Sequence, residues 1–372
     1  MLPPVKKMIS VKKSIQSIAA FVTALAFTFL SGSSMNAEVK VTLEPDALLT
    51  QHWAMPTLLN PAATGDIDFI RIRGGARLDY LGSKDSPKNF LATGDSPFKV
   101  FGKRIGAGVV VNSNSYDLFR NLQVSAQGSY KLRFKNCSLS IGLQAGYFHT
   151  KFKGSEFVIY HTPGQDGEGT GPDIEGGEEG ETENPPAIED DGNDINDYPT
   201  QDVSAGTFDL GVGIRFEHPK FYVGVSGMHL TNPKMELKKD GQENTDSRYM
   251  ESKLPMTLYF EAGGNIGLNN TLFTLQPSLL LGTEFSKIDA VLDLRATYNN
   301  RVTFGLDYRW NRAAGIMAGL IIKDFYVGYA WEYDYSLHPH GSTGNHELVL
   351  GYQFKLNLGG KNTFSHRSIR IM

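Results

Sequence analysis

In several apolar or glycine-rich stretches of this 372-residue sequence, the charged residues are separated from one another by even numbers of positions. Side chains alternate between the two faces of a β-strand, so each such stretch predicts a strand with one polar and one apolar face. Four of these residues are acids and one is a base, so they can pair with one another: Asp209, Asp307, Asp334, Glu347 and Arg309. We predict that they belong to a polar network enclosed by the strands.

The sequence lacks the arrangements that carry common enzymatic chemistry, namely HExxH, GxSxG, a Walker loop and paired cysteines. We therefore predict that the protein is not an enzyme and uses no cofactor. His338, His340 and His346 gather near one loop, where we interpret them as solvent-exposed; adventitious metal binding by the first two is the alternative. No basic patch has interleaved aromatic residues, so nucleic acid is not an expected partner.

Residues 163–202 hold fourteen Asp or Glu residues and no Lys or Arg, with many Gly and Pro residues. Low hydrophobicity and high charge are typical of disordered segments, so we predict a disordered acidic loop. Residues 189–197 loosely resemble acidic calcium loops, whose oxygen ligands suit a hard cation, although the full spacing is not met. A weak calcium site is the alternative to a solvated loop.

The N-terminus has the three parts of a secretory signal peptide. A lysine-rich stretch at 6–13 precedes an apolar stretch at 15–30, and small residues follow at 31–37. We predict that residues 1–37 are a signal peptide cleaved after Ala37; a membrane anchor is the alternative. Residues 38–65 are not strand-like, and we predict that they form a periplasmic segment or a plug.

Strands must position the charged residues, and the clearest strands form the last hairpin. The arms at 324–335 and 345–357 each place aromatic and aliphatic residues on one face and polar or small residues on the other. Arms of about ten residues or more, with Trp and Tyr, fit strands that cross a membrane, whereas soluble strands average about 5–6 residues. A soluble sandwich is the alternative.

Fourteen candidate strands follow residue 65. Their predicted bounds are 66–77, 88–101, 104–112, 119–132, 138–152, 203–216, 220–231, 254–268, 271–284, 287–299, 301–310, 313–322, 324–335 and 345–357.

The lengths of the connections provide an independent test. Every long loop (153–202, 232–253 and 336–344) follows an odd-numbered strand, whereas the loops after even-numbered strands are short. Short periplasmic turns and long outer loops are the pattern of bacterial outer-membrane barrels. A Lys or Arg facing the bilayer midplane would cost about 2–4 kcal/mol, so the charged faces must point into the lumen. We predict an all-β, transmembrane antiparallel β-barrel of about fourteen strands over 66–357, in the outer membrane.

Several short motifs occur in order along the chain. They are LNPAATG at 59–65, FDLGVG at 208–213, HLTNP at 229–233, GLDYR at 305–309, YDY at 333–335 and GNHEL at 344–348. In this order they resemble the PorP/SprF family of type IX secretion and gliding-motility outer-membrane proteins. The sequence departs from the family pattern in RLDY at 77–80, in the acidic loop, and in NSNSY at 112–116, which we predict to be an outer turn.

The resemblance implies a FadL-like barrel with an N-terminal plug-like segment, in which Asn60, Pro61 and Gly65 form a plug or docking motif. It also implies that the partners are periplasmic type IX secretion components and a secreted adhesin with a C-terminal sorting domain, besides outer-membrane lipid. The predicted function is docking of machinery or adhesin cargo at the cell surface. A FadL-like channel for small hydrophobic solutes is the alternative.

The last residues, 358–372, form a basic segment that we predict to lie in the periplasm. Lys361, Arg367 and Arg370 are its candidate docking residues. We expect the barrel to fold without this tail.

Overall fold

The computed structural model describes residues 39–43, 48–83, 86–156, 199, 201–237, 250–269, 271–285, 287–336, 339 and 341–356. The predicted signal peptide, nearly all of the acidic loop, His338, His340 and the basic tail with Lys361, Arg367 and Arg370 lie outside these residues. Among the described residues, no helix is long and apolar enough to cross a membrane.

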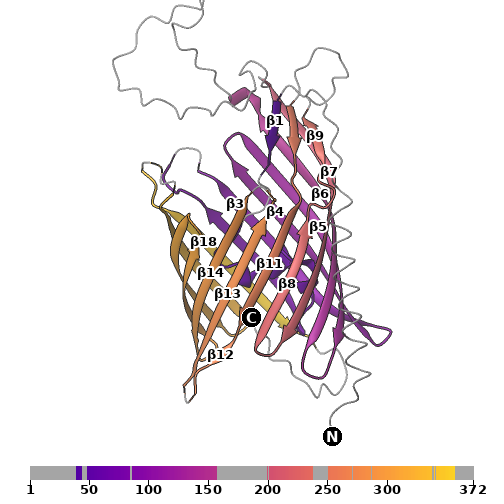
Figure 1. The fold of residues 1–372 in the computed structure, drawn as a ribbon, viewed down its shortest axis with the longest axis vertical. Helices are drawn as coiled ribbons and strands as arrows, with labels where there is room; N and C mark the ends of the chain where they lie inside the picture. Colours follow the sequence, from indigo (N-terminus) through magenta and orange to yellow (C-terminus); the bar gives the residue numbers. More distant parts are fainter. Residues whose placement is uncertain are drawn as a thin grey trace, which may run out of the picture. The chain divides into compact units, whose positions relative to one another are not determined.

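Fourteen long antiparallel strands form a closed barrel (Figure 1). They are β2 (Phe69–Leu78), β3 (Lys88–Val100), β4 (Lys103–Tyr116), β5 (Phe119–Arg133), β6 (Ser138–Lys153), β7 (Asp202–His218), β8 (Phe221–Met228), β11 (Thr257–Gly264), β13 (Phe273–Thr283), β14 (Ile288–Tyr298), β15 (Val302–Arg309), β16 (Ala313–Ile322), β17 (Phe325–Asp334) and β18 (Asn345–Lys355).

Each of these strands pairs with its neighbours in the sequence, and β18 pairs with β2 to close the circle. At that seam Glu347 lies opposite Arg77. The short strand β12 (Ile266–Gly267) extends the line of β11 along β13. Closure leaves no barrel strand with a free edge, which is the condition for crossing a membrane with strands.

The predicted alternation places polar residues inside the barrel and apolar residues outside it. On β14, Leu294 is 51% exposed on the outer surface, whereas its neighbours Asp293 and Arg295 are 4% and 3% exposed. The last hairpin follows the same rule, since Leu350 is 49% exposed and Glu347 is 2% exposed. The fourteen predicted strands are confirmed, with differences of a few residues at their ends.

One predicted turn is wrong. Residues 112–116 continue β4 and pair with β5, with Ser113 opposite Leu122. Asn112 and Asn114 are buried and face inward. In a barrel with a polar lumen, alternating Asn and Ser residues belong to a strand as readily as to a turn, because the inner face accepts polar side chains.

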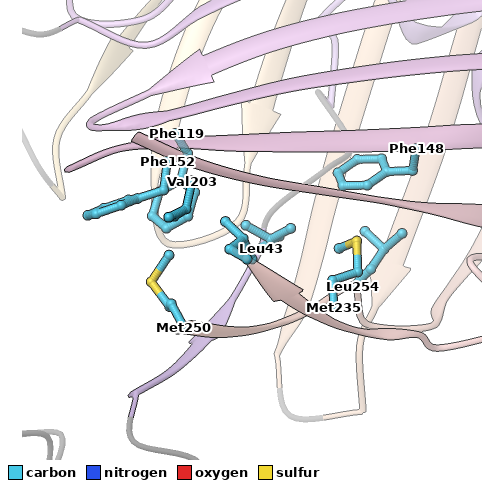
Figure 2. Close-up of a cluster of buried hydrophobic side chains, with 9 residues drawn as sticks. Leu43, Phe119, Phe148, Phe152, Val203, Met235, Met250 and Leu254 are labelled. Atoms are coloured by element: carbon cyan, nitrogen blue, oxygen red, sulfur yellow. The ribbon is translucent and has the colours of Figure 1, made fainter. Parts of the chain in front are cut away.

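A second, three-stranded sheet lies where the long connections meet. It joins β1 (Val39–Thr42) in parallel to β10 (Met250–Lys253), which pairs with β9 (Lys234–Leu237). The expectation that residues 38–65 lack strands is therefore wrong for β1. Beside this sheet, Leu43 packs into a buried apolar cluster with Phe119, Phe148, Phe152, Val203, Met235, Leu237, Met250 and Leu254 (Figure 2).

Residues 48–66, here called the inner segment, contain three single-turn 3-10 helices: η1 (His52–Ala54), η2 (Pro56–Leu58) and η3 (Pro61–Ala63). A fourth, η4 (Gly154–Glu156), follows β6. Upstream of the inner segment, β1 pairs with β10 in a long connection. The other end of the inner segment, at Gly65, approaches Pro97 and Gly106, near the short turn between β3 and β4. The inner segment therefore runs through the barrel from the long-loop end to the short-turn end.

Substituting Leu294 with Arg places a charge on the apolar outer face near the middle of β14. We expect the free energy of unfolding in phospholipid vesicles to fall by about 2–4 kcal/mol. Leu272, 57% exposed beside a short turn, provides the control, because an Arg there lies near the interface and costs about 0–1 kcal/mol. Equal losses in denaturant titrations of the two variants would contradict this placement of the lipid-facing band.

Candidate functional site

The inner segment is held to the barrel wall by polar contacts, first at Glu347 of β18. The two carboxylate oxygens of Glu347 accept hydrogen bonds from the consecutive backbone N–H groups of Thr50 and Gln51, both 2.8 Å long. The Thr50 hydroxyl donates to Glu332 of β17 over 2.5 Å. Hydrogen bonds to an ionised acceptor are stronger than neutral ones, so these two acids anchor the start of the segment.

Two arginines balance these acids. The Arg77 guanidinium lies 2.5 Å from a Glu332 oxygen and 3.5 Å from a Glu347 oxygen, and it donates to the Thr50 hydroxyl over 3.0 Å. Arg309 donates to the Leu48 carbonyl over 2.8 Å and lies 3.4 Å from Glu332. Burial of charge is costly unless each ion is paired, and this cluster pairs both acids with cations.

The middle of the inner segment contacts the wall through His52 and Trp53. The His52 imidazole lies 2.6 Å from a carboxylate oxygen of Asp293. The Trp53 ring has the Arg295 guanidinium 4.1 Å from its centroid and meets the Tyr326 ring edge-on at 5.7 Å between centroids. His52 is therefore fixed by β14, and Trp53 by β14 and β17.

Asn60 begins the η3 helix and also reaches the wall. Its side-chain oxygen accepts the Ala62 N–H over 2.9 Å, which caps η3, and Pro61 occupies the first helical position. Both features favour the start of a helix. The Asn60 amide donates to Glu261 of β11 over 3.1 Å, and Glu261 in turn pairs with Arg215 of β7.

Glycines in the wall make room for η3. A Cβ atom on Gly142 of β6 would lie 2.3 Å from the Ala62 nitrogen, and one on Gly213 of β7 would lie 2.1 Å from the Asn60 side-chain oxygen. Any larger residue at either position would overlap the segment. The backbones of β6 and β7 therefore lie in direct contact with η3.

Gly65 ends the segment in a conformation that glycine favours. Its φ is +62°, and a Cβ atom there would lie 2.6 Å from the Gly106 Cα atom. Its N–H donates to Asp95 over 2.8 Å, and Asp95 and Asp66 both pair with Arg71, at 2.5 and 2.7 Å. These contacts fix the point where the inner segment turns into β2.

The five residues of the predicted polar network are all buried, but they lie in three clusters. Arg309 and Glu347 share the cluster around Arg77 and Glu332. Asp307 is also buried, two positions before Arg309 on β15. No direct pair joins Arg309 to Glu347 among the contacts described above, because Glu332 and Arg77 lie between them.

Two of the five residues belong elsewhere. Asp334 accepts a hydrogen bond from the Tyr80 hydroxyl over 2.9 Å and lies 3.3 Å from Arg312, both near the long-loop end. Asp209 accepts from Gln123 over 2.8 Å and lies 3.0 Å from the His229 imidazole. The network is therefore divided between separate parts of the wall.

Sequence reasoning missed the arginines of β2. Arg71, Arg73 and Arg77 are 1%, 4% and 6% exposed, and Arg73 donates to the carbonyl of Ala54 in η1. Their even spacing was a usable signal, because residues at even intervals share one face of a strand. Asp95 on β3 was missed because the alternation of that strand is poor in the sequence.

Residues 41–352 match the family described as type IX secretion system membrane protein PorP/SprF. The chain belongs to this family. As a PorP/SprF protein with a closed membrane barrel, it is located in the outer membrane. The stretches that carried the resemblance in the sequence supply Asn60, Arg309 and Glu347, which hold the inner segment against the wall.

No curated protein matches the PorP/SprF chain. Three solved structures are similar at 10% sequence identity. They are the monoaromatic hydrocarbon channel CymD (TM-score 0.44, covering 84% of this chain and 94% of the channel), the toluene transporter TodX of P. putida (0.41, 81% and 94%) and the outer membrane protein Omp33 of Acinetobacter baumannii (0.39, 77% and 98%).

Substituting Gly142 with Ala tests the close fit between wall and segment. The added methyl group overlaps the Ala62 backbone, so we expect an overpacking loss of about 1–3 kcal/mol in the free energy of unfolding. Gly128 of β5 is the matched control, since a Cβ there meets nothing within 4 Å. The measurement is denaturant unfolding of both variants in the same vesicles; an unchanged Gly142→Ala protein would show that η3 does not lie against β6.

Proposed function

We propose that this barrel is a docking platform of the type IX secretion system, which holds an exported surface protein at the outer end and secretion components at the periplasmic end. Family membership makes the chain a membrane component of that system. The docking role, a part in gliding motility and the identity of the cargo as an adhesin with a C-terminal sorting domain are the proposal.

The observation that carries the proposal is a cavity at the long-loop end, above the start of the inner segment. Its volume is about 450 Å³, and Leu48 of the inner segment forms part of its lining. Arg77, Tyr80 and Tyr259 also line it. An interior occupied by a bound segment, beneath an open cavity, suits a surface that receives a partner better than a conduit through the barrel.

The lining of this cavity suits a polypeptide. It carries both acids and bases, among them Asp79, Asp289 and Arg312, together with Asn and Tyr side chains. An extended peptide presents backbone donors and acceptors as well as charged groups, all of which can pair with such a lining. A channel for small hydrophobic solutes would require an apolar lining, so we do not favour that alternative.

At the opposite end, we propose that the inner segment closes the barrel as a plug. Asn60, Pro61 and Gly65 lie in its last third, nearest the short turns. All three are buried against the wall and shape this plug, whereas the tail residues Lys361, Arg367 and Arg370 are the proposed periplasmic docking residues. Deleting residues 360–372 should leave the barrel folded but reduce recovery of secretion components with it.

Deletion of the gene should reduce display of at least one surface adhesin that has a C-terminal sorting domain. In the deleted strain, the wild-type gene should restore display, because the barrel supplies the docking site. Whole-cell immunofluorescence measures the adhesin, and movement on agar measures gliding. Normal display of every such protein together with normal gliding would contradict the proposal.

Variants expressed in the same deletion strain test whether adhesin display depends on the cavity or only on a folded barrel. An Asn89→Trp variant fills the cavity from its lining, while Phe90→Trp places the same indole ring on the outer face, where Phe90 is 54% exposed. Phe90→Trp should restore display and Asn89→Trp should not, with equal amounts of folded barrel in the membrane. Uptake of a labelled fatty acid by reconstituted wild-type protein would instead favour the solute channel.

A further inference from the structure

The short-turn end of the barrel carries a ring of exposed cations, here called the basic rim. Its members are Lys99, Lys103, Arg133, Lys135, Lys220, Arg301, Lys323 and Lys355. Among the described residues at this end, Asp324 is the one exposed acid. Glu217 and Asp68 are half-buried and face cations: Glu217 pairs with Lys131 of the wall, whereas Asp68 pairs with Arg104 and also lies 3.7 Å from Arg133 of the basic rim.

The basic rim follows the circumference of the barrel. Its cations lie at the ends of β3, β4, β5 and β18, and in the turns between β5 and β6, β7 and β8, β14 and β15, and β16 and β17. A protein partner that docks on one side would select one sector of the rim. A distribution around most of the rim is instead expected for a partner that surrounds the barrel, which is the lipid leaflet.

Large apolar side chains accompany the cations. Phe98, Phe134 and Phe354 are 45%, 55% and 45% exposed, and each directly precedes a member of the basic rim in the sequence. Phe101, at the tip of the turn between β3 and β4, is 99% exposed. Phe rings insert at the boundary between headgroups and acyl chains, and Lys or Arg side chains extend from there to the phosphates. The rim thus has both parts of a headgroup contact.

The rim belongs to the end with short turns, which in outer-membrane barrels faces the periplasm. The leaflet around it is the inner leaflet of the outer membrane. We propose that the basic rim binds the phosphates of anionic phospholipids in this leaflet. Anionic lipids attract clusters of Lys and Arg near a membrane surface, and this attraction falls within a Debye length of the surface. The inference does not depend on the docking role.

Lipid retention by the purified full chain tests the inference. The protein is reconstituted into vesicles of phosphatidylglycerol and phosphatidylethanolamine, extracted in mild detergent, and its retained lipids are measured by mass spectrometry. We expect phosphatidylglycerol to be enriched roughly threefold to tenfold over the vesicle composition at low salt. In 1 M salt the enrichment should disappear, because the Debye length shrinks to about 3 Å.

Two triple variants locate the binding. Lys99→Glu, Lys135→Glu and Lys323→Glu together should abolish the enrichment. The control changes three exposed cations near the long-loop end, Lys88, Arg120 and Lys234, to Glu, and should retain the enrichment. Absence of enrichment in the wild type, its persistence in 1 M salt, or equal loss in both variants overturns the inference. If the rim variant does not fold, the salt dependence of phosphatidylglycerol enrichment in the wild-type protein still tests the inference.

Discussion

The contact between Glu347 and the backbone of Thr50 and Gln51 connects the main parts of this molecule. Glu347 lies on β18, the last strand of the barrel, opposite Arg77 of β2, the first strand of the barrel. The same carboxylate therefore lies at the seam that closes the barrel. A buried carboxylate without donors is costly, and here a cation and two N–H groups supply what water would supply outside. Closure of the barrel and seating of the inner segment therefore favour one another.

The inner segment and the wall each supply what the other lacks. Short 3-10 turns leave backbone groups without partners, and irregular backbone is tolerated at membrane depth only where protein surrounds it. The wall offers charged side chains that would be equally unfavourable without partners. Glycines such as Gly142 and Gly213 bring the two backbones close enough for these exchanges. The polar lumen is therefore the binding surface for the segment.

The barrel could be predicted because its signal is local: alternation with a period of two residues is visible within each strand. That signal fails where both faces or all residues are polar, as at 112–116 in β4. Contacts of the inner segment could not be predicted, because partners such as Asn60 and Glu261 are 201 positions apart in the sequence. The strand β1 was missed for the same reason, since Val39 pairs with Met250 of β10, which is also far away in the sequence.

The path of the inner segment restricts the order in which the chain can assemble. The chain enters the lumen beside β10 at one end and leaves it at Gly65 near the other, with Trp53, the His52–Asp293 contact and several buried hydrogen bonds between. Threading the segment lengthwise into an already closed barrel would move its bulky and polar side chains past the whole length of the packed lumen. A lateral entry, before β18 meets β2, requires no threading. We therefore expect β18 to pair with β2 after the inner segment has entered the barrel.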